Sequence, residues 1–156
     1  MITIEIPGRP AIRLDYLVTD FNGTIAAGGR LLAGVADRLV ALSGQLHLTV
    51  VTADTFGRVH AEVQGLPVEV TVLSAGREDV AKVAHVDGLG ADATVALGNG
   101  YNDRLMLSRA ALGLAIMGAE GAAVSAWQAA DALYADVRDA LDALLDPQRL
   151  VATLRS

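Results

Sequence analysis

Residues 14–24 read Leu-Asp-Tyr-Leu-Val-Thr-Asp-Phe-Asn-Gly-Thr, an apolar run that leads into Asp20 and then into turn residues. A short apolar run closed by turn residues is typical of a buried parallel strand. Asp20 would then lie at the carboxyl end of that strand, where open α/β sheets bind ligands, and Gly23 allows a sharp turn close to a ligand. A carboxylate in this position is either a nucleophile or a metal ligand, unless Asp20 only caps the loop that follows.

The composition is that of a globular protein with an aliphatic core. The chain has 156 residues, of which 53% are hydrophobic and 4% aromatic, and we expect one domain over residues 1–156. The absence of cysteine excludes disulfides and thiolate metal sites, and the net charge of −6 argues against a nucleic-acid partner. No apolar segment has the length of a membrane span and the first residues do not resemble a signal peptide, so we expect a cytoplasmic protein without a membrane partner.

Strand-like and helix-like segments alternate along the chain, which predicts a three-layer α/β/α Rossmann-like fold with a mostly parallel sheet. Residues 2–6 alternate apolar and polar side chains and are expected to form an N-terminal strand, antiparallel to the run at 12–20. Trp127 shares a predicted helix face with Val124 and is expected in the core. The other predicted strands are 46–51, 68–73, 94–97, 112–117 and 132–135; the predicted helices are 33–43, 58–64, one from 80, 103–110, 121–130 and one from 137.

Polar residues follow four of these segments at the strand ends or at the start of a neighbouring helix. They are Asp20, Thr52, Lys82 and the loop 99–103. Because the carboxyl ends of parallel strands converge, these groups could share one site suited to phosphoryl transfer onto a carboxylate. Lys82 is the only lysine of the chain, which favours a role over a surface lysine whose stem lies along the protein.

The order of these motifs resembles the four signature motifs of the haloacid dehalogenase-like (HAD) superfamily. The resemblance extends from about residue 14 to the end of the chain, and within the superfamily it is strongest to the phosphorylation domain of P-type ATPases. The matching segments are Asp20-Phe-Asn-Gly-Thr24, Thr52-Ala-Asp54, Lys82 and Gly98-Asn-Gly-Tyr-Asn-Asp103. Four motifs in the family's order are a far more specific signal than any one of them.

The resemblance implies a role for each matching residue. Asp20 would be the nucleophile that accepts the phosphoryl group, which Thr52 and Lys82 would hold. Mg²⁺ would bind to Asp20, to the backbone carbonyl of Asn22 and to Asn99, with Asp103 orienting its water ligands. The substrate-binding positions that the resemblance implies are Gly23, Thr24, Ala53, Asp54 and Asn102.

Two positions depart from the family pattern, and both carry an amide in place of an acid. The phosphatases of the family usually have a second Asp at the position of Asn22, where it protonates the leaving group and activates water. An amide cannot perform this acid–base work, which is worth roughly 10²–10⁴-fold in rate. Asn99 stands where the family usually has an Asp that binds the metal, so Mg²⁺ should bind more weakly here.

The short spacing between the motifs leaves no room for a cap domain. The predicted helices and strands occupy the segments between Thr24 and Thr52 and between Thr52 and Lys82. In the family, an uncapped site is typical of proteins that act on large, macromolecular substrates or whose site is covered by a neighbouring subunit of a homo-oligomer. The partner we expect is a phosphorylated substrate.

The sequence thus predicts an Mg²⁺-dependent phosphatase-like phosphohydrolase that acts on phosphoric ester or anhydride bonds through a phospho-aspartate at Asp20. Turnover would be slow because Asn22 and Asn99 replace acids. One alternative is a regulatory protein of the same fold that senses phosphate or a phosphorylated partner. A second is a receiver-type signalling domain, which is disfavoured because its phosphorylated Asp follows the third strand, whereas Asp20 follows the first main parallel strand.

Overall fold

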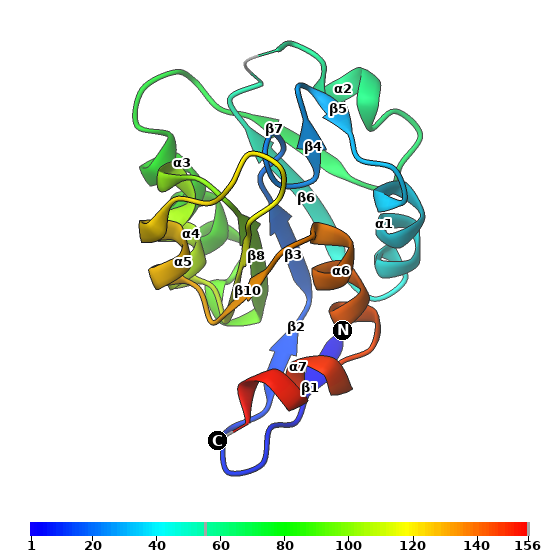
Figure 1. The fold of residues 1–156 in the computed structure, drawn as a ribbon, viewed down its shortest axis with the longest axis vertical. Helices are drawn as coiled ribbons and strands as arrows, with labels where there is room; N and C mark the ends of the chain where they lie inside the picture. The colour runs from blue at the N-terminus through cyan, green and yellow to red at the C-terminus, as the bar shows by residue number, and fades with distance from the viewer. Residues whose placement is uncertain (55, 156) are drawn as a thin grey trace.

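Six parallel strands form the central sheet of the molecule (Figure 1). The computed structural model describes residues 1–54 and 56–155. The strand order is β10–β9–β8–β3–β6–β7, and each neighbouring pair runs parallel. The strands are β3 (Tyr16–Thr19), β6 (His47–Thr52), β7 (Glu69–Val72), β8 (Thr94–Gly98), β9 (Leu112–Ile116) and β10 (Ala132–Tyr134). The predicted parallel sheet is confirmed.

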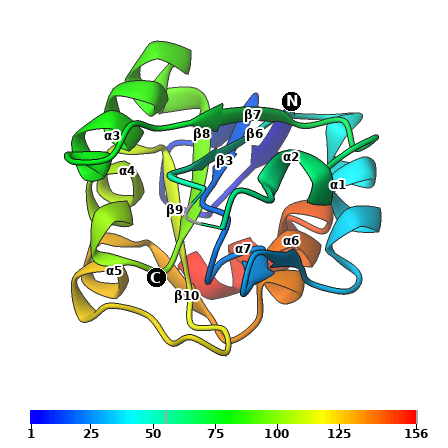
Figure 2. The same cartoon turned by 90° about the horizontal axis from the view of Figure 1, so that it is seen from above.

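Helices cover both faces of the sheet and complete the three layers. Helices α3, α4 and α5 lie on one face, and α1 and α6 lie on the other (Figure 2). The helices are α1 (Val35–Ser43), α2 (Val59–Glu62), α3 (Glu78–Leu89), α4 (Arg104–Arg109), α5 (Val124–Ala129), α6 (Val137–Leu145) and α7 (Gln148–Leu154), with short 3₁₀ helices η1 (Ala91–Ala93) and η2 (Tyr101–Asp103). Within the described residues, none of these helices has the length and apolar character of a membrane span.

Two small antiparallel ribbons accompany the sheet. Strands β1 (Ile2–Ile4) and β2 (Ile12–Leu14) pair with Ile2 opposite Leu14, which confirms the predicted antiparallel N-terminal strand. Strands β4 (Ala26–Ala27) and β5 (Arg30–Leu31) form a hairpin in a segment where the sequence analysis predicted no strand. Gly28 and Gly29 both have positive φ angles, the conformation that a two-residue hairpin turn requires.

The central strand β3 shows how the sheet divides the core. Leu17 and Val18 are both fully buried but belong to different apolar clusters, because successive side chains of a strand point to opposite faces. Trp127 does not belong to either cluster: its side chain is 54% exposed on α5, so the prediction that it is a core residue is wrong. Helix α5 has only six residues, and Ala126 is the residue that it buries instead.

Candidate functional site

The turn that follows β3 holds Asp20 at the carboxyl end of the sheet. The backbone N–H of Asp20 donates to Leu97 O of β8 (3.0 Å), so this residue is still anchored to the sheet. The next residues form a tight turn in which Phe21 O accepts hydrogen bonds from the backbone of Thr24, Ile25 and Ala26. The carboxylate of Asp20 is therefore fixed at the sheet edge predicted from the sequence.

Lys82 connects two carboxylates at this edge. Its Nζ donates to Asp20 Oδ1 and to Asp103 Oδ1, each at 2.6 Å. The lysine is 1% exposed, Asp103 is 0% exposed and Asp20 is 8% exposed, so the cluster is almost completely buried. The structure thus brings together three of the residues that the sequence singled out, from the turn after β3, from α3 and from η2.

The charges of this cluster do not balance, and the pKa values reflect it. Burial and the neighbouring Asp103 carboxylate raise the pKa of Asp20 to about 7, although Lys82 opposes the shift. Burial disfavours the charged form of Lys82, but the two carboxylates outweigh it and raise the pKa of the ammonium group. Two carboxylates with one ammonium group leave an excess negative charge, which favours a bound cation or a proton.

Both carboxylate oxygens of Asp103 accept hydrogen bonds. While Oδ1 accepts from Lys82, Oδ2 accepts hydrogen bonds from the backbone N–H groups of Asn99 (3.0 Å) and Gly100 (2.9 Å). The side chain also lies so close to Gly98 that a Cβ there would be 2.5 Å from Asp103 Cβ. The loop after β8 is thus folded around this carboxylate.

The Thr24 hydroxyl lies beside the second oxygen of Asp20, Oδ2, and also reaches Asn99. The hydroxyl of Thr24 is 3.4 Å from both Asp20 Oδ2 and Asn99 Oδ1, so it links the two. Asn99 Nδ2 donates to Gly121 O (3.1 Å), which turns Oδ1 toward Thr24. Gly23 has φ +83°, and a Cβ at this position would lie 2.4 Å from Asn99 Nδ2, so only glycine fits.

This donor set fits Mg²⁺ better than a transition metal. Among residues 1–54 and 56–155, no cluster of three or more His, Cys, Asp or Glu side chains is placed to bind a metal. Asp20 Oδ2 and Asn99 Oδ1 are hard oxygen donors, and Mg²⁺ commonly binds through one or two carboxylates together with water and substrate phosphate.

Asn22 is directed away from the charged cluster. Its Oδ1 accepts a hydrogen bond from the backbone N–H of Gly29 at the tip of the β4–β5 hairpin (2.9 Å). The backbone of Gly23 donates to Ala26 O (2.7 Å) in the same turn. The Asn22 amide therefore ties the Asp20 loop to the hairpin.

Thr52 ends β6, the strand next to β3, and is buried. Its Oγ1 accepts a hydrogen bond from the backbone N–H of Asp54 (2.9 Å), which leaves the hydroxyl proton free to be donated. The Asp54 carboxylate accepts from the backbone N–H groups of Arg58 and Val59 at the start of α2. Ala53 lies between these two residues in a half-buried loop.

Asn102 has a partner that the sequence analysis missed. Its Nδ2 donates to Glu78 Oε2 (2.8 Å), and the neighbouring Arg104 donates to Asp79 Oδ2 (3.0 Å). A signal was present in the sequence, because Glu78 lies one helical turn before Lys82 and on the same face.

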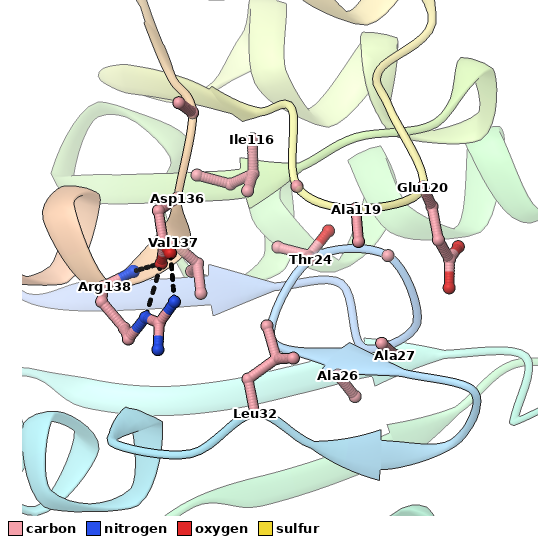
Figure 3. A pocket seen from close by; sticks show the side chains of 13 residues that line it. Thr24, Ala26, Ala27, Leu32, Ile116, Ala119, Glu120, Asp136, Val137 and Arg138 are labelled. Carbon is pink, nitrogen blue, oxygen red and sulfur yellow. Dashed lines mark hydrogen bonds and ion pairs between the residues drawn. The ribbon is translucent and has the colours of Figure 1, made fainter.

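A small cavity borders the Asp20 loop (Figure 3). Its volume is about 170 Å³, and Gly23 and Thr24 form the wall nearest to Asp20. Apolar side chains such as Leu32 and Ile116 line it, and Glu120, Asp136 and Arg138 add charged groups. The Arg138 guanidinium is already paired with Asp136.

Comparison with known proteins agrees with this arrangement. No protein-family model matches the chain. A structure named as an HAD superfamily hydrolase from Legionella pneumophila superimposes with a TM-score of 0.71 over 92% of this chain and 88% of its own, at 15% identity. The chain has the haloacid dehalogenase-like fold. This confirms the resemblance on which the sequence-based fold prediction rested.

Two further solved structures have this fold in common with the chain. The 3-deoxy-D-manno-octulosonate 8-phosphate phosphatase of Moraxella catarrhalis, solved with a magnesium ion, a phosphate ion and KDO, is 14% identical, with a TM-score of 0.69 over 90% of this chain and 92% of that one. A zinc-transporting PIB-type ATPase is 24% identical, with a TM-score of 0.63 over 78% of this chain and 20% of the ATPase.

A relative by sequence is the uncharacterized protein MJ0073 of Methanocaldococcus jannaschii. It is 39% identical over 84 residues, which cover 51% of this chain and 90% of the archaeal protein. The chain and this archaeal protein belong to the same family.

Proposed function

We propose that this chain is an Mg²⁺-dependent phosphohydrolase that forms a phospho-aspartate at Asp20, with residues 1–156 acting as one domain. The observation that carries the proposal is the contact of Lys82 Nζ with both Asp20 and Asp103 at 2.6 Å, at the carboxyl end of a sheet with the HAD-like fold. A buried carboxylate fixed beside a cation, with its other oxygen free of a strong partner, suits nucleophilic attack on phosphorus.

The first step is phosphoryl transfer to Asp20. Oδ2 of the ionised carboxylate attacks phosphorus, the bond from phosphorus to the leaving-group oxygen breaks, and the leaving group departs with that electron pair. Lys82 stabilises charge near the attacking carboxylate, and the Thr52 hydroxyl donates a hydrogen bond to a phosphoryl oxygen. Water then attacks the phosphorus of the phospho-aspartate, the bond from phosphorus to Oδ2 breaks with its electron pair returning to the carboxylate, and inorganic phosphate leaves with the protons of the water.

Mg²⁺ would be held by the Asp20 carboxylate, the backbone carbonyl of Asn22 and Asn99 Oδ1. The ion would supply positive charge that neutralises the phosphoryl oxygens as they approach the carboxylate. Asp103 would act through water, because both of its oxygens already accept hydrogen bonds from protein groups.

The leaving group decides how well this site can work. Asn22 has no titratable proton and its oxygen is bound to Gly29, so the leaving group receives no proton from this position. The carboxylate that leaves from an acyl phosphate departs without protonation, whereas the alkoxide that leaves from an alkyl phosphate needs a proton. The proposal therefore assigns the chain to activated donors, with slow turnover of ordinary phosphate monoesters.

The partner implied by the proposal is a phosphorylated substrate that reaches an uncapped site. Between Thr24 and Thr52 the chain contains the β4–β5 hairpin, α1 and β6, and between Thr52 and Lys82 it contains α2, β7 and the start of α3. These are elements of the fold itself, and they leave the edge of the sheet accessible to a macromolecular substrate or to a second subunit.

Phosphate release from acetyl phosphate tests the proposal. We expect Mg²⁺-dependent release by the wild-type protein and loss of release in Asp20→Asn. Asp37→Asn is the matched control, because Asp37 is an exposed carboxylate in the first turn of α1. Equal rates for Asp20→Asn and the wild type would overturn the proposal.

A second candidate function is a phosphate-responsive regulatory protein on the same fold. It is favoured by the two amides, since Asn22 binds the β4–β5 hairpin and Asn99 binds Gly121 of the loop before α5. In this case phosphorylation of Asp20 would change the conformation of these loops, and the phosphate would be released only slowly. A phosphorylated protein that accumulates without release of phosphate would favour this candidate.

A further inference from the structure

Helix α3 and the segment that contains η2 and the start of α4 meet along a line of polar contacts. Three residues of α3 take part, and each contacts one of three consecutive residues opposite. Glu78 accepts from Asn102 (2.8 Å), Asp79 accepts from Arg104 (3.0 Å), and Lys82 donates to Asp103 (2.6 Å). We call these three contacts the α3–η2 seam. Figures 1 and 2 both show α3 beside α4, to which η2 leads.

The seam has a buried end and an outer end. Lys82 and Asp103 are 1% and 0% exposed, whereas the Asp79 and Arg104 side chains are 13% and 23% exposed. Glu78 and Lys82 are four residues apart and Asp79 and Lys82 three apart, so all three lie on neighbouring positions of one helix face. The outer contacts therefore set the position of the helical turn from which Lys82 extends.

Arg104 is itself fixed in place, which makes it a firm partner for Asp79. Its guanidinium lies 3.8 Å from the centre of the Tyr101 ring, and it also donates to Tyr101 O (2.8 Å). Burial opposes ionisation of Asp79, but hydrogen bonds from Arg104, Val80 and Arg77 outweigh it and lower the pKa of this carboxylate. Asp79 thus remains charged over the pH range in which Asp20 titrates.

We propose that Glu78 and Asp79 are positioning residues, which hold α3 against η2 so that Lys82 reaches Asp20 and Asp103 together. The role rests on the proposed function of Asp20, because positioning matters only if Lys82 acts in phosphoryl transfer. A lysine stem is flexible and does not fix its own ammonium group. For Nζ to keep 2.6 Å contacts to two acids at once, the helix that carries Lys82 has to stay in place relative to both. Misplacement of a reacting group by about 1 Å can cost about 100-fold in rate.

The same assignment gives Asn102 a structural role. The sequence-based prediction placed this residue among the substrate-binding groups. In the seam its Nδ2 donates to Glu78, and the two residues that follow it, Asp103 and Arg104, make the contacts to Lys82 and Asp79.

A matched control lies on the same helix. Asp87 pairs with Arg109 of α4 (2.7 Å), as Asp79 pairs with Arg104, but Asp87 lies at the other end of α3. Asp79→Ala and Asp87→Ala each remove one ion pair between α3 and α4. If Asp79 only adds stability, neither variant will change the effect of Lys82→Met on unfolding or the rate of phosphoryl transfer.

The first test is a double-mutant cycle read by urea unfolding. We expect the shift in midpoint caused by Lys82→Met to be smaller in the Asp79→Ala background than in the wild type, because the contact to Asp103 is already loosened there. The shift should be unchanged in the Asp87→Ala background. Equal shifts in all three backgrounds would overturn the proposal. If Lys82→Met does not fold, Asp103→Asn replaces it, since it changes the same contact.

The second test measures the single-turnover rate of phosphoryl transfer from acetyl phosphate at saturating Mg²⁺. Asp79→Ala should slow it by about 10- to 100-fold, and Asp87→Ala should leave it unchanged. Glu78→Gln should retain the wild-type rate and Glu78→Ala should not, because glutamine still offers an oxygen to Asn102. Equal rates for Asp79→Ala and Asp87→Ala would contradict the assignment. If the wild type accepts no phosphate, the proposed function fails, and the unfolding cycle alone decides on the seam.

Discussion

Substitution of Lys82 by methionine should destabilise the protein by an amount that depends on pH. Methionine keeps most of the apolar stem but removes the cation that contacts Asp20 and Asp103 at 2.6 Å. Removal of one partner from a buried ion pair costs about 3–5 kcal/mol. This is a large part of the roughly 5–15 kcal/mol expected for a domain, so the variant should be folded but much less stable.

The two carboxylates contribute to this loss differently. Asp20 can take up a proton when Lys82 is removed, since its pKa is about 7. Protonating Asp20 at pH 8 costs about 1.4 kcal/mol, so the contribution of Asp20 to the loss of stability is limited to about this value. Asp103 keeps two backbone hydrogen bonds and loses a charged one, which is worth about 1.5–3 kcal/mol. At pH 5 Asp20 is already protonated, so only the share of Asp103 should remain.

The sign of the pH effect follows from the direction of the shift. The pKa of Asp20 is higher in the folded protein than in an unfolded chain, so its contribution to stability is complete below about pH 4 and is lost as the pH rises through about 7. Lys82→Met raises this pKa further and extends the loss to higher pH. Urea unfolding at pH 5 and pH 8, without Mg²⁺, measures both effects.

A surface ion pair provides the control for this prediction. Arg109→Met removes the partner of Asp87, and both of these side chains are about half exposed, so the loss should be at most about 1 kcal/mol and similar at both pH values. A Lys82→Met variant that is as stable as Arg109→Met would refute the account of the buried cluster. So would a variant whose free energy of unfolding falls by the same amount at pH 5 and at pH 8.

Three further outcomes are expected. Asn22→Asp should raise the steady-state hydrolysis of p-nitrophenyl phosphate by up to about 10²–10⁴-fold, because it supplies the missing general acid; no gain would show that position 22 does not reach the leaving group. The rate of phosphoryl transfer from acetyl phosphate should rise with pH through about 7 at low Mg²⁺, and added Mg²⁺ should move this midpoint to lower pH, since both the proton and the cation compete for Asp20. Gly23→Ala should lower the unfolding midpoint more than Gly65→Ala, which has a similar φ of +80° but open space around it, because only the first Cβ collides with Asn99; equal losses would mean that the loop accommodates the methyl group.

The sheet and the residues at its edge could be predicted because they depend on local patterns. Apolar runs that stop at turn residues located the strands, and Asp20 follows one of them directly. Lys82 and Asp103 lie on a helix and on a 3₁₀ turn, yet parallel topology brings them to the same edge. The charged cluster therefore follows from strand order together with the family resemblance.

The features that the sequence did not reveal depend on tertiary contacts. The hydrogen bond from Asn102 to Glu78 joins two segments 24 residues apart, and the position of Glu78 one helical turn before Lys82 does not by itself identify this partner. Trp127 was expected in the core because it shares a helix face with Val124, but both of these side chains are exposed and α5 buries the small Ala126 instead. The β4–β5 hairpin escaped notice because each strand has only two residues.

Mapping of phosphate on the protein tests the central claim most directly. The wild-type protein would be incubated with acetyl phosphate and Mg²⁺, quenched in acid, digested and analysed by mass spectrometry, with Asp20→Asn and a sample without Mg²⁺ alongside. The account predicts one phosphoryl group on the peptide that contains Asp20, released by hydroxylamine and absent from both controls. A protein that acquires no phosphate, or acquires it on another residue, would contradict the account.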